Sequence, residues 1–244
     1  MQYAVIAAGE GSRLAQEGIT APKPLVEVGG EVLLDRLLRI FVDNGASCVN
    51  VIVNDQHPST LQHLHQLQQK GWPLRYVVKS TPSSMHSFYE LSPLLREDEP
   101  FVLTTVDTVF REQEFHRYVA ALERTLAEGA ADGLMGVTDY IDDEKPLYVA
   151  TDDNLNIQAF LDENSSSPYV SGGIYGLHPR SLQTLRACVE RGEHRMRNFQ
   201  RALLRDGLRL KAWPFGKVFD IDHAADIAKA VSFLNEDESA SSST

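Results

Sequence analysis

Residues 3–14 read YAVIAAGEGSRL, and PKPL follows at residues 22–25. The apolar first half is typical of a buried strand, and the Gly-Glu-Gly turn after it lets backbone N–H groups approach an anion, because glycine has no Cβ. Ser12 adds a hydroxyl group, Arg13 a guanidinium group, and Lys23 a point charge held between two prolines. These residues predict a strand that ends in a binding site for a polyphosphate.

The composition limits what such a site can belong to. With 244 residues, of which 43% are hydrophobic, the chain can bury one ample core. Its 23 basic and 34 acidic residues give a net charge of −11, which argues against nucleic-acid or membrane partners. No apolar run approaches the roughly 20 residues of a membrane span. We expect a cytoplasmic protein that binds small anionic molecules and could form a homo-oligomer.

The order of apolar segments predicts an α/β fold with three layers. Short β-branched runs alternate with segments of helical period, which is typical of a mostly parallel, mixed, Rossmann-like sheet with helices on both faces. The expected strands of the first half are 3–8, 49–53, 74–78 and 101–105, with helices at 32–42 and 61–67. Close-spaced strands without a helix between them are expected at 134–137, 147–151, 157–161 and 169–177. Helices at 180–191 and 195–205, strands at 208–213 and 218–221, and a helix at 223–234 complete the prediction.

The glycine loop by itself is a weak signal, since Gly-x-Gly also makes simple tight turns. Leu14 replaces the third glycine of a dinucleotide fingerprint, and the Gly-Lys-Ser/Thr ending of a Walker loop is absent. Combined with the PKPL block, however, the loop resembles the amino-terminal signature of the nucleotidyltransferases that make nucleoside-diphosphate sugars and related activated alcohols. The resemblance extends more loosely over nearly the whole chain, through TVD at 105–107, SGGIY at 171–175 and FDID at 219–222.

The resemblance implies a GT-A-like nucleotidyltransferase in which an acceptor phosphate attacks the α-phosphorus of a nucleoside triphosphate and pyrophosphate leaves. Charge stabilisation and in-line placement matter most for such a reaction. Arg13 is expected at the β- and γ-phosphates, and Lys23 at the α-phosphate and the incoming phosphate. The expected nucleotide-binding residues are Ala7, Ala8, Gly9, Gly11, Ser12, Arg13, Lys23 and Ser84.

Two aspartates are candidates for holding Mg²⁺, which usually takes one or two carboxylates plus substrate oxygens. Asp107 follows the apolar strand at 101–106, at the end where open α/β sheets bind ligands. Asp222 follows the strand at 218–221. Asp220 lies on the same face of this strand, and we expect it to lie next to the metal site without binding the metal. Each has a plainer interpretation: Asp107 as a turn residue, and Asp222 as the N-cap of the helix that begins at His223.

The base and acceptor sites are less well defined. Members of the family recognise the nucleotide base partly through a turn that corresponds to residues 80–87 here. This turn lacks the usual Gly-Thr-Ala sequence, so Ser84 could contact the nucleoside or simply cap a helix. Asp162 and Gly173 are expected at the acceptor. In sugar-activating members a lysine follows the acidic residue and binds the sugar phosphate, and this chain has none there. Two lysines could replace it, unless they are ordinary surface residues: Lys145 and Lys217.

A basic stripe in the second half allows several interpretations. Arg197, Arg201 and Arg205 align at i, i+4 and i+8 of an expected helix. They could form a solvated face, a partner surface or part of the acceptor site. Cys48 and Cys188 lie far apart and suggest neither a disulfide framework nor a zinc site.

We therefore predict a single nucleotidyltransferase domain over 1–235, with a nucleotide-binding part at 1–131 and an antiparallel substrate-side insert or lid at 132–178. Residues 236–244 are acidic and serine-rich, which predicts a disordered tail. The expected acceptor is a sugar 1-phosphate, so the product would be an NDP-sugar. The alternatives are a cytidylyltransferase for phosphocholine or a phosphonate, and a non-catalytic nucleotide-sensing paralogue.

Overall fold

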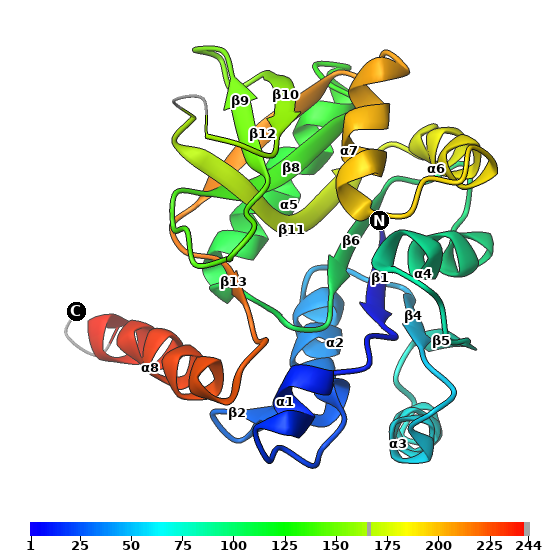
Figure 1. Cartoon of the computed structure of the whole chain (residues 1–244), viewed down its shortest axis with the longest axis vertical. Coiled ribbons are helices and arrows are strands. Elements are labelled where there is room, and N and C mark those ends of the chain that lie inside the picture. Colours follow the sequence, from blue (N-terminus) through cyan, green and yellow to red (C-terminus); the bar gives the residue numbers. More distant parts are fainter. Residues whose placement is uncertain (165–166, 242–244) are drawn as a thin grey trace.

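The computed structural model describes residues 1–164 and 167–241, and a nine-stranded sheet lies at its centre (Figure 1). The first half of the chain supplies four strands that pair in parallel in the order β6-β1-β4-β5. These are β1 (Gln2–Ala7), β4 (Val49–Val53), β5 (Leu74–Val78) and β6 (Phe101–Thr105). All six residues of β1 are buried, as expected for a strand covered on both faces.

The second half extends the same sheet instead of forming a separate lid. Its strands are β8 (Gly133–Thr138), β9 (Tyr148–Thr151), β10 (Ile157–Leu161), β11 (Tyr169–Leu177) and β12 (Leu210–Phe215). The strands at 132–178 pair antiparallel with one another, as expected of the insert, but they continue the main sheet instead of forming a lid, because β11 pairs directly with β6 through residues 174–177. β8 lies on the other side of β11, and β12 pairs in parallel with β8. Only β10 and β11 run against the common strand direction, so the sheet is mixed and mostly parallel.

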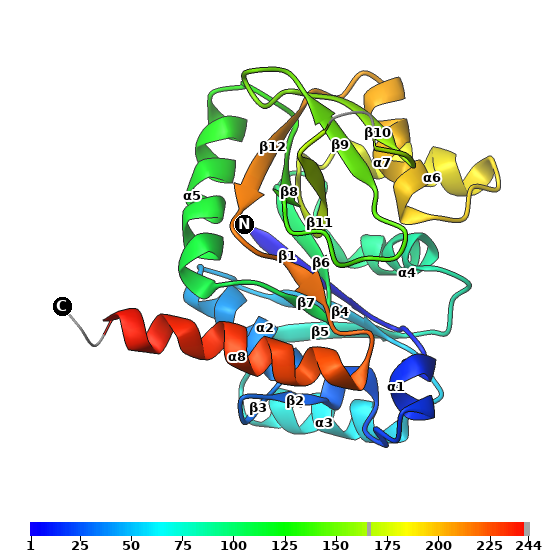
Figure 2. The same ribbon diagram turned by 60° about the vertical axis from the view of Figure 1, so that its left-hand side comes forward.

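Helices cover both faces of this sheet (Figure 2). On one face lie α1 (Ser12–Gln16), α2 (Leu33–Asp43), α3 (Pro58–Gln69), α5 (Glu112–Ala127) and α8 (Ala224–Ser241). On the other lie α4 (Ser84–Leu91), α6 (Ser181–Glu190) and α7 (Met196–Arg205). Because side chains alternate along a strand, β1 contributes Tyr3, Val5 and Ala7 to one core and Ala4 and Ile6 to the other. The predicted three-layer α/β architecture is confirmed.

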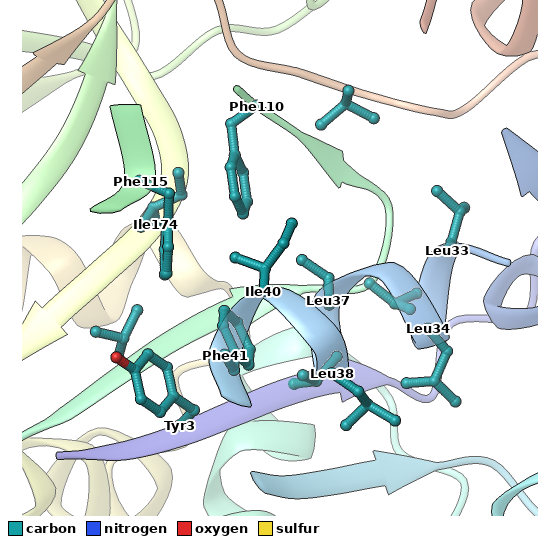
Figure 3. Close-up of a cluster of buried hydrophobic side chains, with 14 of the residues drawn as sticks. Tyr3, Leu33, Leu34, Leu37, Leu38, Ile40, Phe41, Phe110, Phe115 and Ile174 are labelled. Atoms are coloured by element: carbon teal, nitrogen blue, oxygen red, sulfur yellow. The ribbon is translucent and has the colours of Figure 1, made fainter. Parts of the chain in front are cut away.

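The core beneath α2 shows how this helix is fixed to the sheet (Figure 3). Leu34, Leu37 and Phe41 are at most 1% exposed, since they recur on the inward face at helical spacing. The ring of Phe41 stacks on Tyr3 with 4.7 Å between centroids and lies 5.5 Å from Phe115. α2 therefore holds the back of β1 in place, and with it the loop that follows.

Short elements complete the fold between the longer helices and strands. They are the 3₁₀ helices η1 (Lys23–Leu25) and η2 (Ser92–Leu94), the hairpin of β2 (Glu27–Val28) with β3 (Glu31–Val32), and the pair of β7 (Thr108–Val109) with β13 (Phe219–Asp220). The β7·β13 pair joins the turn after β6 to the segment before α8. Residues 107 and 222 are brought together in this way, although they are far apart in the sequence.

The last helix is longer than expected. α8 continues to Ser241, past the predicted end at Leu234, so residues 236–241 are helical, and residues 242–244 of the expected disordered tail lie outside the described residues. Residues 235–241 contain no Gly or Pro that would stop a helix, and they include the good helix formers Glu and Ala. Among the described helices, none has the length and apolar character needed to cross a bilayer.

Candidate active site

The loop after β1 has a backbone that requires glycine at one position. Gly11 has φ +62° and precedes the first residue of α1. A Cβ built on Gly11 would lie 3.2 Å from the Cβ of Lys23, which is closer than most such contacts. Gly11 therefore lets the loop and η1 approach one another, and this approach places the side chain of Lys23 beside the loop.

A cavity of about 520 Å³, here called the loop cavity, lies between this loop, the start of α4 and the end of β6. It is open at the carboxyl ends of β1 and β6, where open α/β sheets bind ligands. Every residue expected to bind the nucleotide lines it, and so do both aspartates expected to bind a metal: Ala7, Ala8, Gly9, Gly11, Ser12, Arg13, Lys23, Ser84, Asp107 and Asp222. The structure therefore brings residues from both ends of the chain to one cavity.

Lys23 lies at the centre of an ion cluster in this cavity. Its Nζ contacts Oδ2 of Asp107 and donates to Oδ1 of Asp222 over 2.8 Å, while Arg13 Nη1 donates to Oδ2 of Asp222 over 3.1 Å. Burial disfavours the ammonium form, but Asp107 and then Asp222 outweigh it and raise the pKa of Lys23 above its usual range. Lys23 is therefore charged at neutral pH. A phosphate entering the cavity would meet two cations whose partners are carboxylates.

Asp222 does not cap α8 with its side chain, because both of its carboxylate oxygens bind Lys23 and Arg13. Asp226 Oδ2 instead accepts the backbone N–H groups of Asp222 and His223, and Glu17 Oε2 accepts that of Ala224. Burial opposes ionisation of Asp222, yet the hydrogen bond from Lys23 and the charges of Lys23 and Arg13 lower its pKa. The carboxylate is ionised and faces the cavity.

Asp220 lies beside this cluster, at the end of β13. Its Oδ1 accepts a hydrogen bond of 3.0 Å from Thr108 Oγ1, which lies 2.7 Å from Thr105 Oγ1. The surrounding protein reduces the hydration of the charged carboxylate, and this effect, followed by the negative charge of Asp107, raises the pKa of Asp220. The residue nevertheless keeps contact with solvent. Thr108 was not singled out from the sequence. A threonine two residues after an apolar strand carries no signal of its own.

The sequence left open whether Ser84 caps α4 or faces the nucleotide site, and the structure gives the capping role to its neighbour Ser83. The N-cap of α4 is Ser83, whose Oγ accepts the backbone N–H of His86, and Ser84 is the first helical residue. The capping interpretation of Ser84 is therefore wrong, and Ser84 is available to the loop cavity that it lines. Its backbone N–H belongs to the first turn of a helix, where N–H groups have no partner within the helix.

A second cavity of about 350 Å³, here called the side cavity, adjoins the loop cavity, since Ser83, Ser84 and Thr105 line both. Gly173 lies in its wall with φ +71°, at a bulge where β11 shifts register between Ser171 and Ile174. A Cβ on Gly173 would lie 3.3 Å from Thr108 Oγ1, so the bulge needs glycine to pass this hydroxyl group. The side cavity is therefore built on the strand that was expected to face the acceptor.

Asp162 lies elsewhere, in a third cavity of about 790 Å³ that we call the arginine cavity. Its carboxylate binds Arg197 over 2.6 Å and Arg201 over 2.8 Å, so it is already occupied by two cations. Lys145 lines both the side and arginine cavities. Lys217 instead lies over the ring of Tyr140, 4.4 Å from its centroid. Of the two lysines considered for the acceptor, only Lys145 lines these cavities.

The donor set of the ion cluster fits a hard divalent cation. Asp107 and Asp222 both contact the single cation Lys23, so both carboxylates reach one point in the cavity. Mg²⁺ commonly takes one or two protein carboxylates and completes its shell with substrate phosphates and water. The described residues contain no group of three or more His, Cys, Asp or Glu side chains placed to hold a metal without substrate.

Comparison with known proteins agrees with this geometry. The model of the MobA-like NTP transferase domain matches residues 3–206. The chain belongs to this family. The predicted membership among nucleotidyltransferases is thereby confirmed, although the matched range ends before Asp220 and Asp222.

Individual relatives of this NTP transferase differ in how much of their length they share with it. CMP-5'-(3-aminopropyl)phosphonate synthase of Streptomyces rubellomurinus is 30% identical over 157 residues, which are 58% of this chain and 24% of that protein. UTP–glucose-1-phosphate uridylyltransferase AglF of Haloferax volcanii is 25% identical over 249 residues, covering 97% of this chain and 98% of that protein. The fold resembles the inositol-1-phosphate CTP transferase of T. maritima with a TM-score of 0.76, at 19% identity and over 95% and 94% of the two chains.

Proposed function

We propose that this chain transfers a nucleoside monophosphate from a nucleoside triphosphate to a phosphorylated small-molecule acceptor. An oxygen of the acceptor phosphate forms a bond to the α-phosphorus, the bond from the α-phosphorus to the bridging oxygen breaks, and pyrophosphate leaves with that electron pair. The observation that carries the proposal is the contact of Lys23 with both Asp107 and Asp222 inside a cavity lined by the glycine loop.

The cations of the loop cavity suit the two polyanions of this reaction. We assign Arg13 to the β- and γ-phosphates and Lys23 to the α-phosphate and the attacking phosphate. Both side chains bind Asp222 in the structure, so the phosphates would compete with a carboxylate for them. Cations placed where negative charge accumulates stabilise the transition state more than they would in water.

A divalent metal is usual in enzymes of this kind, and we assign Mg²⁺ to Asp107 and Asp222. When bound, Mg²⁺ would offset the negative charge of the phosphates. Asp107 and Asp222 would orient the phosphates through it, while Thr108 holds Asp220 at the edge of the site through a hydrogen bond. Without that offset, two polyanions would repel one another in the cavity.

We favour a sugar 1-phosphate as acceptor, giving an NDP-sugar. The support is the similarity to the glucose-1-phosphate uridylyltransferase over 97% of the chain. A second candidate is cytidylyl transfer to a phosphonate, favoured by the 30% identity to the phosphonate synthase over 58% of the chain. The ion cluster of Arg13, Lys23, Asp107 and Asp222 argues against a non-catalytic paralogue.

An assay of pyrophosphate release tests the proposal. Purified protein with Mg²⁺ is given each common triphosphate together with glucose 1-phosphate, phosphocholine or 2-aminoethylphosphonate. We expect release with one triphosphate and one acceptor class, and a fall of about 100-fold or more for Lys23→Ala, because one charged contact to the transition state is lost. Lys70→Ala, at an exposed lysine at the end of α3, serves as the matched control.

Two results would contradict the proposal. One is nucleotide binding without pyrophosphate release for any pair, with Lys23→Ala binding as the wild type does; this favours the sensing paralogue. The other is turnover that Lys23→Ala leaves unchanged. Release with phosphocholine or 2-aminoethylphosphonate and CTP alone would favour the cytidylyltransferase over the sugar enzyme.

A further inference from the structure

Arginines gather on one helix of this acidic chain. Helix α7 and the residue before it lie beside β10 (Figure 1), and they carry Arg195, Arg197, Arg201 and Arg205. Arg195 and Arg197, together with Lys145, line both the side cavity and the arginine cavity. Three cationic side chains therefore border a space that adjoins the loop cavity at Ser84 and Thr105.

These cations differ in the hydrogen bonds and ion pairs that they make with the rest of the protein. Arg201 binds Asp162 over 2.8 Å and the carbonyl of Phe160 over 3.0 Å, and Arg205 binds Glu193 over 3.3 Å. Arg197 donates from Nη1 to Asp162 and from Nη2 to the carbonyl of Lys145.

Neither the guanidinium group of Arg195 nor the ammonium group of Lys145 makes a hydrogen bond or ion pair with another described residue; the carbonyl of Arg195 accepts backbone N–H groups of α7. Arg195 is exposed, as is Lys145. Guanidinium and ammonium groups that face a cavity without a protein partner are suited to an anion from outside.

Acidic side chains in the same lining support this argument. Asp143 and Asp220 also line the side cavity, so an anionic ligand there needs cations to offset them. Leu147, Tyr175 and Met196 add apolar and aromatic side chains to the lining of the side cavity. It can thus accommodate a small molecule whose anionic group lies toward α7 and whose remaining part lies against these side chains.

We propose that Arg195 and Arg197, with Lys145, bind the anionic phosphorus group of the acceptor, a phosphate or phosphonate, within the side cavity. Asp162 is then a positioning residue that holds Arg197 through their ion pair, and it does not contact the acceptor. This assignment rests on the proposed nucleotidyl transfer. It takes the cations for the acceptor from α7, the residue before it and Lys145, one of the two lysines considered from the sequence.

Steady-state kinetics with the acceptor found in the assay above test this assignment. We expect Arg195→Gln and Arg197→Gln each to raise the acceptor KM roughly tenfold or more, because a charge-assisted hydrogen bond is lost. The triphosphate KM should stay at its wild-type value. Arg197→Lys should recover part of the loss, and Arg205→Gln, on the same helix but paired with Glu193, should behave as the wild type. An unchanged acceptor KM in both glutamine variants would overturn the assignment.

Equilibrium titration with inorganic phosphate separates this inference from the proposed reaction. Phosphate binding that is lost in Arg195→Gln but kept in Lys23→Ala supports an anion site at α7, even if no acceptor is turned over. Phosphate binding that only Lys23→Ala removes, or no binding to the wild type, overturns the site. Melting temperatures of all variants identify any loss that comes from misfolding.

Discussion

Lys23 couples the two halves of the candidate site through its charge. Its side chain is 11% exposed and touches Asp107 and Asp222, so one ammonium group neutralises both carboxylates. Phosphates that draw Lys23 away would leave the two carboxylates without a cation. A metal cation that enters with the nucleotide would then replace the positive charge of Lys23 between the carboxylates. We therefore expect metal binding to depend on nucleotide.

Asp222→Asn tests this dependence directly. With the accepted triphosphate present, we expect the affinity for Mn²⁺ to fall roughly tenfold or more, because one of the two carboxylates proposed to hold the metal is lost. Electron paramagnetic resonance of free Mn²⁺ measures the affinity independently of turnover. Asp153→Asn, at an exposed aspartate in the turn between β9 and β10, is the control. Wild-type Mn²⁺ affinity in Asp222→Asn would remove this aspartate from the metal site.

Among the elements, α2 could be predicted from its sequence more easily than α5. The apolar residues of α2 recur without interruption, and the helix was expected at 32–42, close to its observed bounds. α5 was missed although Phe115, Tyr118, Val119 and Leu122 recur at helical spacing, because charged residues lie between them. Both helices pack against β1 through Phe41 and Phe115, which contact Tyr3.

Phe41→Ala tests how far this packing supports the site. We expect the free energy of unfolding to fall by about 3–5 kcal/mol, because a fully buried ring is removed and leaves a cavity. Val42→Ala on the same helix changes an exposed side chain and should cost no more than about 0.5 kcal/mol. Urea denaturation followed by circular dichroism measures both. Equal losses in the two variants would contradict the packing argument.

Across the whole molecule, the carboxyl-terminal segment completes a site that the amino-terminal loop begins. β13 pairs with β7, and α8 then packs through Ala230 and Phe233 on the core that contains β1. Asp222 lies between these two elements and reaches Arg13 and Lys23, 209 and 199 residues earlier. The position of Asp222 therefore depends on the anchoring of α8.

Phe233→Ala tests this dependence. Phe233 is 4% exposed, and its ring lies 5.7 Å from that of Phe219. We expect a loss of about 3–5 kcal/mol in unfolding free energy and, below the melting temperature, a lower metal-dependent rate of pyrophosphate release, because Asp222 is held less firmly. Asn235→Ala, at an exposed position of the same helix, is the control. A destabilised Phe233→Ala variant with wild-type turnover would show that Asp222 is held independently of α8.

Local patterns in the sequence predicted much of the fold. β4, β5, β6, β10 and β11 have the expected bounds, because short β-branched runs between turn residues are a local signal. The predicted disorder after residue 235 was wrong through residue 241, since polar composition does not by itself end a helix. The place of β11 beside β6 could not be predicted, because strand order depends on which edges meet after the chain crosses the sheet.

The sequence by itself determined the family of this chain and predicted a phosphate-binding amino-terminal loop, because glycine spacing and charged residues act within a few positions of one another. Only the tertiary structure decided that Lys23 bridges Asp107 and Asp222, that Asp226 and not Asp222 caps α8, and that Asp162 is occupied by arginines. Arg195 was overlooked because it lies outside the i, i+4 stripe. Such contacts join residues far apart in the chain, and their energies depend on distances that sequence spacing does not set.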